Sequence, residues 1–156
     1  MSRTQYPAPP LPRAGQLRAW WRAPASPTAL AWYLAQAART HDAPLLVVAR
    51  DNHGANQIEA DLHTLLGGDP SLPVVAFPDW ETLPYDRFSP HPDIISQRLS
   101  ALHRLPTLKR GLVVVPVQTL LQQLAPRSYV IGGSFNLEVG QRLDLEAEKR
   151  RLESAG

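Results

Sequence analysis

The sequence predicts an α/β domain: a parallel sheet with helices on both of its faces. Two observations predict it. Strand-like apolar runs alternate with segments of helical periodicity, and each run is continuously apolar instead of alternating with polar residues. The three runs are "PLLVVAR" (44–50), "LPVVAF" (72–77) and "GLVVVPV" (111–117). Because strands that are separated by helices are joined by crossovers, we expect them to pair in parallel and to be buried on both faces.

The first two helices carry their own start signals. Residues 1–15 are rich in proline and predict an extended lead-in. In "SPTALAWYLAQAART", Ser26 suits the N-cap and Pro27 suits the first helical position. Asp51 or Asn52 is then expected to cap "GANQIEADLHTLL", and the two glycines that follow predict its end.

The third helix is predicted in "DIISQRLSALHRL" (93–105), where isoleucines and leucines recur at helical spacing. Either Asp93 or Ser89 is expected to cap this helix. After the third strand, "QTLLQQLAP" predicts a short helix that ends at Pro126. Strands and helices therefore alternate through the whole of this region.

The character of the sequence changes around Gly132 and Gly133. "SFNLEVGQRLD" alternates as an exposed strand does, and "LEAEKRRLESAG" predicts a charged amphipathic helix. We therefore expect an extended segment over 1–15, an α/β domain over 16–133 and the truncated beginning of a second domain over 134–156.

The composition fits a globular protein of a reducing compartment. Apolar residues make up 44% of the 156 residues, the formal net charge is +2, and there is no cysteine. The modest charge supports nucleic-acid contact only weakly. No apolar run approaches the ~20 residues that span a bilayer, and the N-terminus lacks the apolar core of a secretory signal. The expected location is the cytoplasm, with no membrane partner.

The loop before the first helix is the place where a phosphate-binding loop would lie. Such a loop needs glycines, a lysine and a hydroxyl in the pattern G-x-x-x-x-G-K-[ST]. The corresponding stretch, "WWRAPASPTAL", has neither glycine nor lysine, and Pro24 and Pro27 lack the N–H groups that would contact phosphate. Only Ala23, Ser26 and Thr28 mark the position of the loop, and we expect no nucleotide cofactor there.

The remaining motifs of catalysis are not found in the sequence. The dinucleotide pattern G-x-G-x-x-G and the nucleophile elbow G-x-S-x-G do not occur, and the five histidines have no metal-ligand spacing. We therefore predict no catalytic residue and no metal site in this chain.

The stretch "FPDWETLPYDRFSPHPD" (77–93) combines aromatic residues, acids and prolines. Prolines restrict the backbone, so the aromatic rings can be held against the sheet without regular structure. A carboxylate pair for acid–base chemistry is disfavoured because acids beside helix starts are common for dipole reasons. Stacking of the aromatic rings, beside Arg87 and Arg98, on nucleic-acid bases is disfavoured by the acids nearby. Trp80→Ala should therefore destabilise the domain by ~3 kcal/mol or more, the usual cost of deleting a buried large aromatic.

Residues 79–106, "DWETLPYDRFSPHPDIISQRLSALHRLP", and the following "RGLVVVPVQTLLQQLAP" closely resemble the N-terminal region of the bacterial transcription-repair coupling factor (Mfd). The resemblance runs from about residue 15 to the end of the chain. It marks a signature loop, expected to be structural, that comprises Trp80, Glu81, Leu83, Pro84, Tyr85, Asp86, Phe88 and, on the helix that follows, Arg98. That region of the family is similar in turn to excinuclease B, whose first domain is helicase-like and has a working phosphate loop. The resemblance implies a degenerate loop here.

The resemblance implies a scaffold and not an enzyme. In the family this region recruits excinuclease A, mostly through second-domain residues beyond Gly156. RNA polymerase, double-stranded DNA, ATP and magnesium belong to C-terminal domains that these residues do not include, and contacts with the rest of the longer chain are expected. "FSPHP" is too short for the DNA-clamping hairpin of excinuclease B.

Two alternatives remain open. One is a nucleotide-binding α/β enzyme with a non-standard site. The other is a direct DNA-binding module that uses Arg18, Arg22, Arg87 and Arg98, which would show a steep salt dependence of its affinity.

Overall fold

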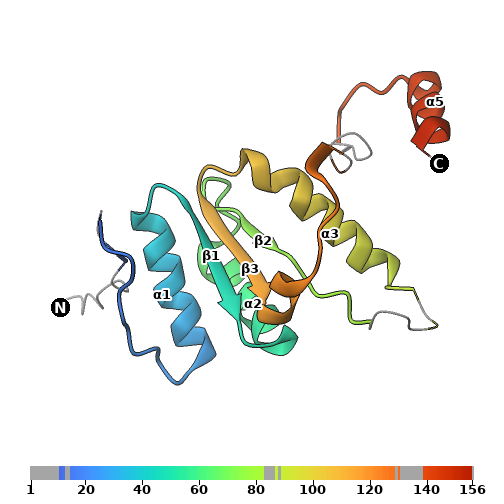
Figure 1. Ribbon diagram of the computed structural model, residues 1–156. Helices are drawn as coiled ribbons and strands as arrows, with labels where there is room; N and C mark the ends of the chain where they lie inside the picture. The colour runs from blue at the N-terminus through green and yellow to red at the C-terminus, as the bar shows by residue number, and fades with distance from the viewer. Residues whose placement is uncertain are drawn as a thin grey trace. The chain divides into compact units, whose positions relative to one another are not determined.

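The computed structural model describes residues 11–12, 15–82, 87, 89–128, 130 and 139–155. The chain divides into two compact units, Met1–Gln122 and Gln123–Gly156. In the first unit the elements are α1 (Pro27–Thr40), β1 (Pro44–Ala49), α2 (Asn52–Leu66), β2 (Val74–Ala76), α3 (Pro92–Arg104), η1 (Leu105–Thr107), β3 (Gly111–Pro116) and η2 (Val117–Leu121) (Figure 1).

The three strands form one parallel sheet in the order β1-β3-β2. Pro44 of β1 lies opposite Gly111, and Val74 of β2 lies opposite Leu112. All six residues of β3 are buried, as its continuous apolar sequence predicts for the central strand of a parallel sheet. The predicted α/β class and the parallel pairing are confirmed.

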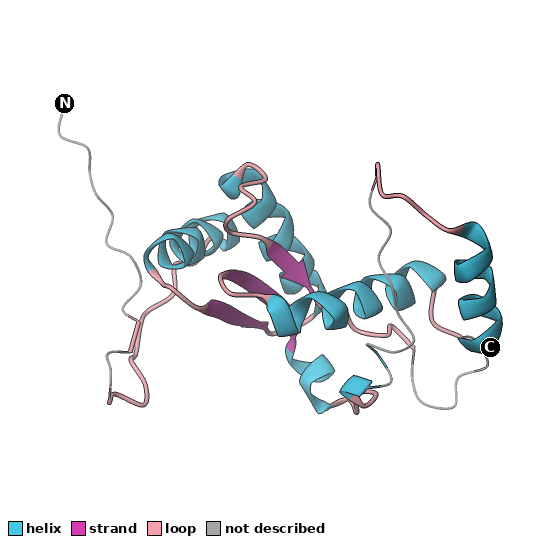
Figure 2. Ribbon diagram, turned by 90° about the horizontal axis from the view of Figure 1, so that it is seen from above, coloured by secondary structure: helices cyan, strands magenta, loops and turns pink. Residues whose placement is uncertain are grey.

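Helices cover both faces of this sheet (Figure 2). On one face, α2 packs on the strands and α1 packs mainly on α2, with Ala31, Ala35 and Ala38 on its buried side. On the other face, α3 places Ala101 in a second cluster with Val113 and other residues of β2 and β3. The sheet is therefore the middle layer of the first unit.

The prediction that every strand is buried on both faces is wrong for β1. Leu45 and Val47 pack against the core on the α1 and α2 side. Leu46 and Val48, on the opposite face, are 59% and 46% exposed. The reason is position: β1 lies at one edge of the sheet, and α3 packs on β2 and β3.

The caps of α1 and α2 confirm the sequence signals. The Ser26 hydroxyl accepts a hydrogen bond from the Ala29 N–H at 3.5 Å. The Asp51 carboxylate accepts one from the Gly54 N–H at 2.8 Å, so Asp51, and not Asn52, is the cap. Gly67 closes α2 in the left-handed conformation, with φ of 59°.

The expected cap of α3 is wrong. His91 is the N-cap, and its Nδ1 accepts a hydrogen bond from the Asp93 N–H at 3.3 Å. Neither Ser89 nor Asp93 caps the helix, because Pro92 at the first helical position sets the start one residue before Asp93.

The region after β3 differs in part from the prediction. In place of a helix over "QTLLQQLAP", the chain forms the 3₁₀ helix η2, which ends at Leu121. In the second unit, α5 (Leu145–Ala155) confirms the charged helix. The expected exposed strand covers 134–144. Residues 134–138 lie outside the described residues, and the prediction is wrong for 139–144, which form a turn followed by chain without regular structure. No helix among the described residues is long and apolar enough to cross a membrane.

The start of β3 gives a testable prediction about stability. Gly111 has φ of 119°, and a Cβ atom there would clash with the carbonyl oxygen of Pro73, which accepts the Leu112 N–H. Gly111→Ala should therefore lower the free energy of unfolding by about 3 kcal/mol or more, as judged from strain and overpacking costs. Urea unfolding measures this.

Gly68→Ala is the matched control. Gly68 also has a positive φ, of 73°, but a Cβ atom there meets no atom within 4 Å. It should cost only ~1–2 kcal/mol, the strain of a left-handed residue. Equal urea midpoints for the two variants would contradict the steric explanation.

Candidate functional site

The carboxyl ends of the three strands are the first place to look for a site. In open parallel sheets, ligands bind outside these ends. Here β1 leads into Arg50 and Asp51, β2 into the signature loop, and β3 into η2. Because the strands are parallel, these three exits lie along the same edge of the sheet.

Arg98 holds the exit of β2. It comes from α3, its side chain is 2% exposed, and its guanidinium lies between two aromatic rings, 4.3 Å from the centre of Phe77 and 4.0 Å from that of Trp80. It also donates a hydrogen bond to the Pro78 carbonyl oxygen at 2.5 Å. Burial lowers the pKa of Arg98, and the charge of Asp79 opposes that shift, so the side chain stays a cation.

Asp79 joins the exit of β2 to that of β3. Its half-buried carboxylate accepts a hydrogen bond from the Thr119 hydroxyl at 3.3 Å and a second from the Gln122 side-chain amide. Thr119 is itself buried. Sequence reasoning missed this group, although an acid two residues after a strand is the signal that could have found it.

A third polar contact joins the exit of β1 to that of β3. The Gln118 amide donates to the side-chain oxygen of Asn52 at 3.2 Å. All three strand exits are therefore connected by side chains of the chain itself. Together with the Arg98 cluster, these contacts occupy the edge where an α/β enzyme of this type places its ligand.

The signature residues divide into two groups. Trp80 is half-buried against Arg98, and Glu81 is exposed with φ of 58°. The remaining members lie outside the described residues: Leu83, Pro84, Tyr85, Asp86 and Phe88. Because Arg98 is buried, it does not present a face to nucleic-acid bases. The contacts of Trp80 and Arg98 are structural. We call the stack of Arg98 between Phe77 and Trp80 the Arg98 clamp.

The loop before α1 offers few groups to a phosphate. Ala23 is exposed in a segment without regular secondary structure, and Thr28 is exposed in the first turn of the helix. The Ser26 hydroxyl is engaged with the Ala29 N–H as the helix cap. Pro24 and Pro27 have no N–H to donate.

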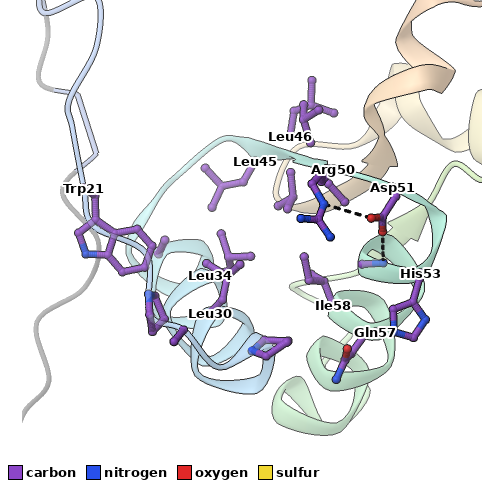
Figure 3. A pocket seen from close by; sticks show the side chains of 18 of the residues that line it. Trp21, Leu30, Leu34, Leu45, Leu46, Arg50, Asp51, His53, Gln57 and Ile58 are labelled. Carbon is purple, nitrogen blue, oxygen red and sulfur yellow. Dashed lines mark hydrogen bonds and ion pairs between the residues drawn. The ribbon is translucent and has the colours of Figure 1, made fainter.

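Beside this loop lies a cleft of about 740 Å³ between α1, β1 and α2 (Figure 3). Its walls are apolar and come from all three elements, with the side chains of Leu30, Leu34, Leu45 and Ile58. Its polar side chains follow β1 into the start of α2 and are Arg50, Asp51, His53 and Gln57. The cleft therefore fits an apolar group better than a phosphate.

The charged pair in the cleft is already satisfied. Arg50 Nε lies 3.2 Å from Asp51 Oδ2, while Asp51 Oδ1 accepts the Gly54 N–H. This backbone hydrogen bond, followed by that from Arg50, lowers the pKa of Asp51. Asp51 is thus an ionised helix cap and a poor general base. Among the described residues, no group of three His, Cys, Asp or Glu side chains is arranged to hold a metal ion.

The fold and this site define an α/β domain whose ligand edge is closed by its own side chains. In sequence, the chain is 43% identical over 128 residues to the transcription-repair-coupling factor of Escherichia coli. The match covers 82% of this chain and 11% of that protein. It is 42% identical over 111 residues to that of Haemophilus influenzae (71% and 9%) and 36% identical over 126 residues to that of Myxococcus xanthus (76% and 10%).

The resemblance to the transcription-repair coupling factor is therefore confirmed, and the chain is a relative of these proteins. It spans about a tenth of the length of the relatives it matches. These relatives are named for coupling transcription to repair. No family model matches the chain.

The Arg98 clamp gives a prediction about coupled stability. Arg98→Met should cost about 3 kcal/mol, because it removes two ring contacts and leaves the Pro78 carbonyl without its donor. Because Trp80 is only half-buried, Trp80→Ala should cost less than a core aromatic does, about 2 kcal/mol in the native background. In the double variant the two costs should overlap by about 1–2 kcal/mol, which urea unfolding of all four proteins measures.

Arg104→Met is the matched control, since Arg104 is exposed at the end of the same helix. It should change stability by no more than about 0.5 kcal/mol. Strictly additive costs for Arg98→Met and Trp80→Ala would show that the stacked arrangement contributes nothing of its own.

Proposed function

We propose that this chain is a non-catalytic module of a transcription-repair coupling factor, acting in the cytoplasm in transcription-coupled nucleotide excision repair. In this proposal the longer protein links stalled RNA polymerase to the excision machinery, and residues 16–133 form the supporting domain. The observation that carries the proposal is the closed carboxyl edge, where Asp79, Arg98 and Gln118 bind neighbouring groups of the chain. The sequence relationship to coupling factors supports it.

We further propose that these residues hold neither nucleotide nor metal. ATP and magnesium would bind in the C-terminal motor of the longer factor, whose activity is ATP-driven DNA translocation. The loop before α1 supports this view, because its serine caps the helix and two of its residues are prolines. The alternative of a nucleotide-binding enzyme would need several converging N–H donors, and Pro24 and Pro27 remove two of them.

The proposed partner is excinuclease A, bound mostly by a second domain that begins within 134–156 and continues beyond Gly156. RNA polymerase and double-stranded DNA would be bound by other domains of the longer factor. In this arrangement the first unit supports the second domain, and the contacts of Arg98 stabilise the first unit in that role.

Calorimetric titration of the chain with Mg-ATP tests the absence of a nucleotide site. We expect no saturable heat up to millimolar Mg-ATP. The titration would therefore detect any binding free energy more favourable than about −4 kcal/mol, which corresponds to a Kd of about 1 mM. Ser26→Ala, titrated in the same way, is the matched variant. Saturable binding that Ser26→Ala abolishes would mean that the loop contacts phosphate and that the enzyme alternative is correct.

Repair by a full-length coupling factor that carries this chain tests the module role. Arg98→Met should reduce capture of excinuclease A and preferential repair of the transcribed strand by about tenfold or more, the factor that ~1.4 kcal/mol of lost binding produces. ATP hydrolysis by the motor should remain within about twofold, since the motor lies elsewhere.

Arg104→Met in the same full-length factor is the control and should leave both activities intact. If Arg98→Met lowered ATP hydrolysis and repair by the same factor, the domain would be part of the motor, and the scaffold proposal would fail.

A further inference from the structure

The charge of the chain is distributed unevenly. Residues 1–41 contain five arginines and no acid, whereas residues 42–156 contain eleven basic and fourteen acidic side chains. The net charge of +2 therefore combines a strongly basic N-terminal quarter with an acidic remainder. A basic region of this kind attracts polyanions, and the attraction is strongest at low salt.

Within this basic region, the described segment 16–22 contains two neighbouring tryptophans. Trp20 is exposed, and Trp21 packs against the domain and so holds the segment in place. Trp21 packs edge-on against Tyr33 of α1, with ring centres 5.1 Å apart, and lines the cleft of Figure 3. Trp20 is 84% exposed, and the guanidinium of Arg18 lies 5.6 Å from its ring centre. The anchor fixes the segment beside α1 (Figure 1), so the exposed ring and its arginine form a platform.

An exposed indole with adjacent arginines suits a partner that has both flat rings and negative charges. Single-stranded nucleic acid supplies both: unpaired bases stack on aromatic side chains, and phosphates pair with guanidinium groups. An acidic peptide would supply charge without regularly spaced rings. A duplex keeps its bases stacked inside, and this segment is not the helix that enters a major groove.

A membrane surface is the other partner that basic aromatic segments bind. Such segments usually lie in the interface as amphipathic helices with one apolar face. Here the segment has no regular secondary structure, and α1 begins only at Pro27, after Pro24. The geometry therefore favours nucleic acid.

We propose that segment 16–22 is a contact site for single-stranded nucleic acid, in which a base stacks on Trp20 while phosphates pair with Arg18 and Arg22. The choice of nucleic acid over a membrane rests in part on the proposed role in repair. The site differs from the Arg98 clamp, which is buried, and from the DNA-binding domains proposed for the rest of the longer factor.

Fluorescence anisotropy of a labelled thymidine oligomer of about 12 nucleotides, within the usual site sizes, tests the proposal with the whole chain. Binding should be saturable, and log K should fall with log salt at a slope of about −1.4 for two phosphate contacts. Trp20→Ala should weaken binding by at least about fivefold, the effect of losing one stacked base, and Trp20→Phe should restore most of it. Arg18→Gln should reduce the magnitude of the salt slope by about 0.7.

Two control variants remove comparable groups elsewhere. Leu121→Ala removes another exposed apolar side chain, and Lys109→Gln removes one exposed positive charge far along the sequence. Both should keep the affinity within about twofold. All variants should keep the thermal midpoint of the native chain, because each replaced side chain is largely exposed.

Four results would overturn the proposal. The first is that the oligomer does not bind, and the second is that Lys109→Gln weakens binding as much as Arg18→Gln does. The third is that a duplex of the same length binds with equal affinity. The fourth is that the chain binds phosphatidylserine vesicles through Trp20 but does not bind the oligomer. None of these assays uses Mg-ATP or excinuclease A. Failure here therefore leaves the proposed module role to its own tests.

Discussion

The cation of Arg98 between the rings of Phe77 and Trp80 is the interaction on which the first unit depends. It comes from the middle of α3 and reaches the chain where β2 ends, so one side chain joins a helix to the edge of the sheet. A buried guanidinium is stable only when its donors and its charge are matched by neighbouring groups. Here two ring faces, a backbone carbonyl and the nearby carboxylate of Asp79 supply that match.

The same interaction helps to fill the end of the sheet where an α/β enzyme binds its ligand. In a parallel sheet the strand exits diverge from one another and leave a crevice for a ligand. In this domain Asp79 draws η2 toward the exit of β2, and Gln118 reaches Asn52 beyond the exit of β1. The side chains of Asp79, Gln118 and Thr119 are therefore engaged by neighbours within the described part of the chain. These contacts occupy the end of the sheet where other α/β proteins bind a ligand.

Much of this fold could be predicted from local signals, and the exceptions have a common physical cause. Continuous apolar sequence predicts β3 as the central strand, and Ser26 and Asp51 cap their helices as short polar side chains do. The exposure of Leu46 could not be predicted in this way, since it depends on the position of β1 in the sheet. The hydrogen-bond partners of Asp79 and Arg98 lie 20 to 43 residues away along the chain, so only folding brings them together.

The uncovered side of β1 has a consequence for the behaviour of this protein in solution. A strand at the edge of a sheet presents N–H and C=O groups that another strand can pair with, and protected edges usually carry charges or bulges. In the described part of the chain, β1 lies at such an edge, and its residues Leu46 and Val48 are exposed to solvent on one face. The strand contains no charged residue. Aggregation through β1 is therefore expected to increase with protein concentration. During folding, intermolecular β-pairing competes with folding for as long as β1 is formed but not covered by another segment.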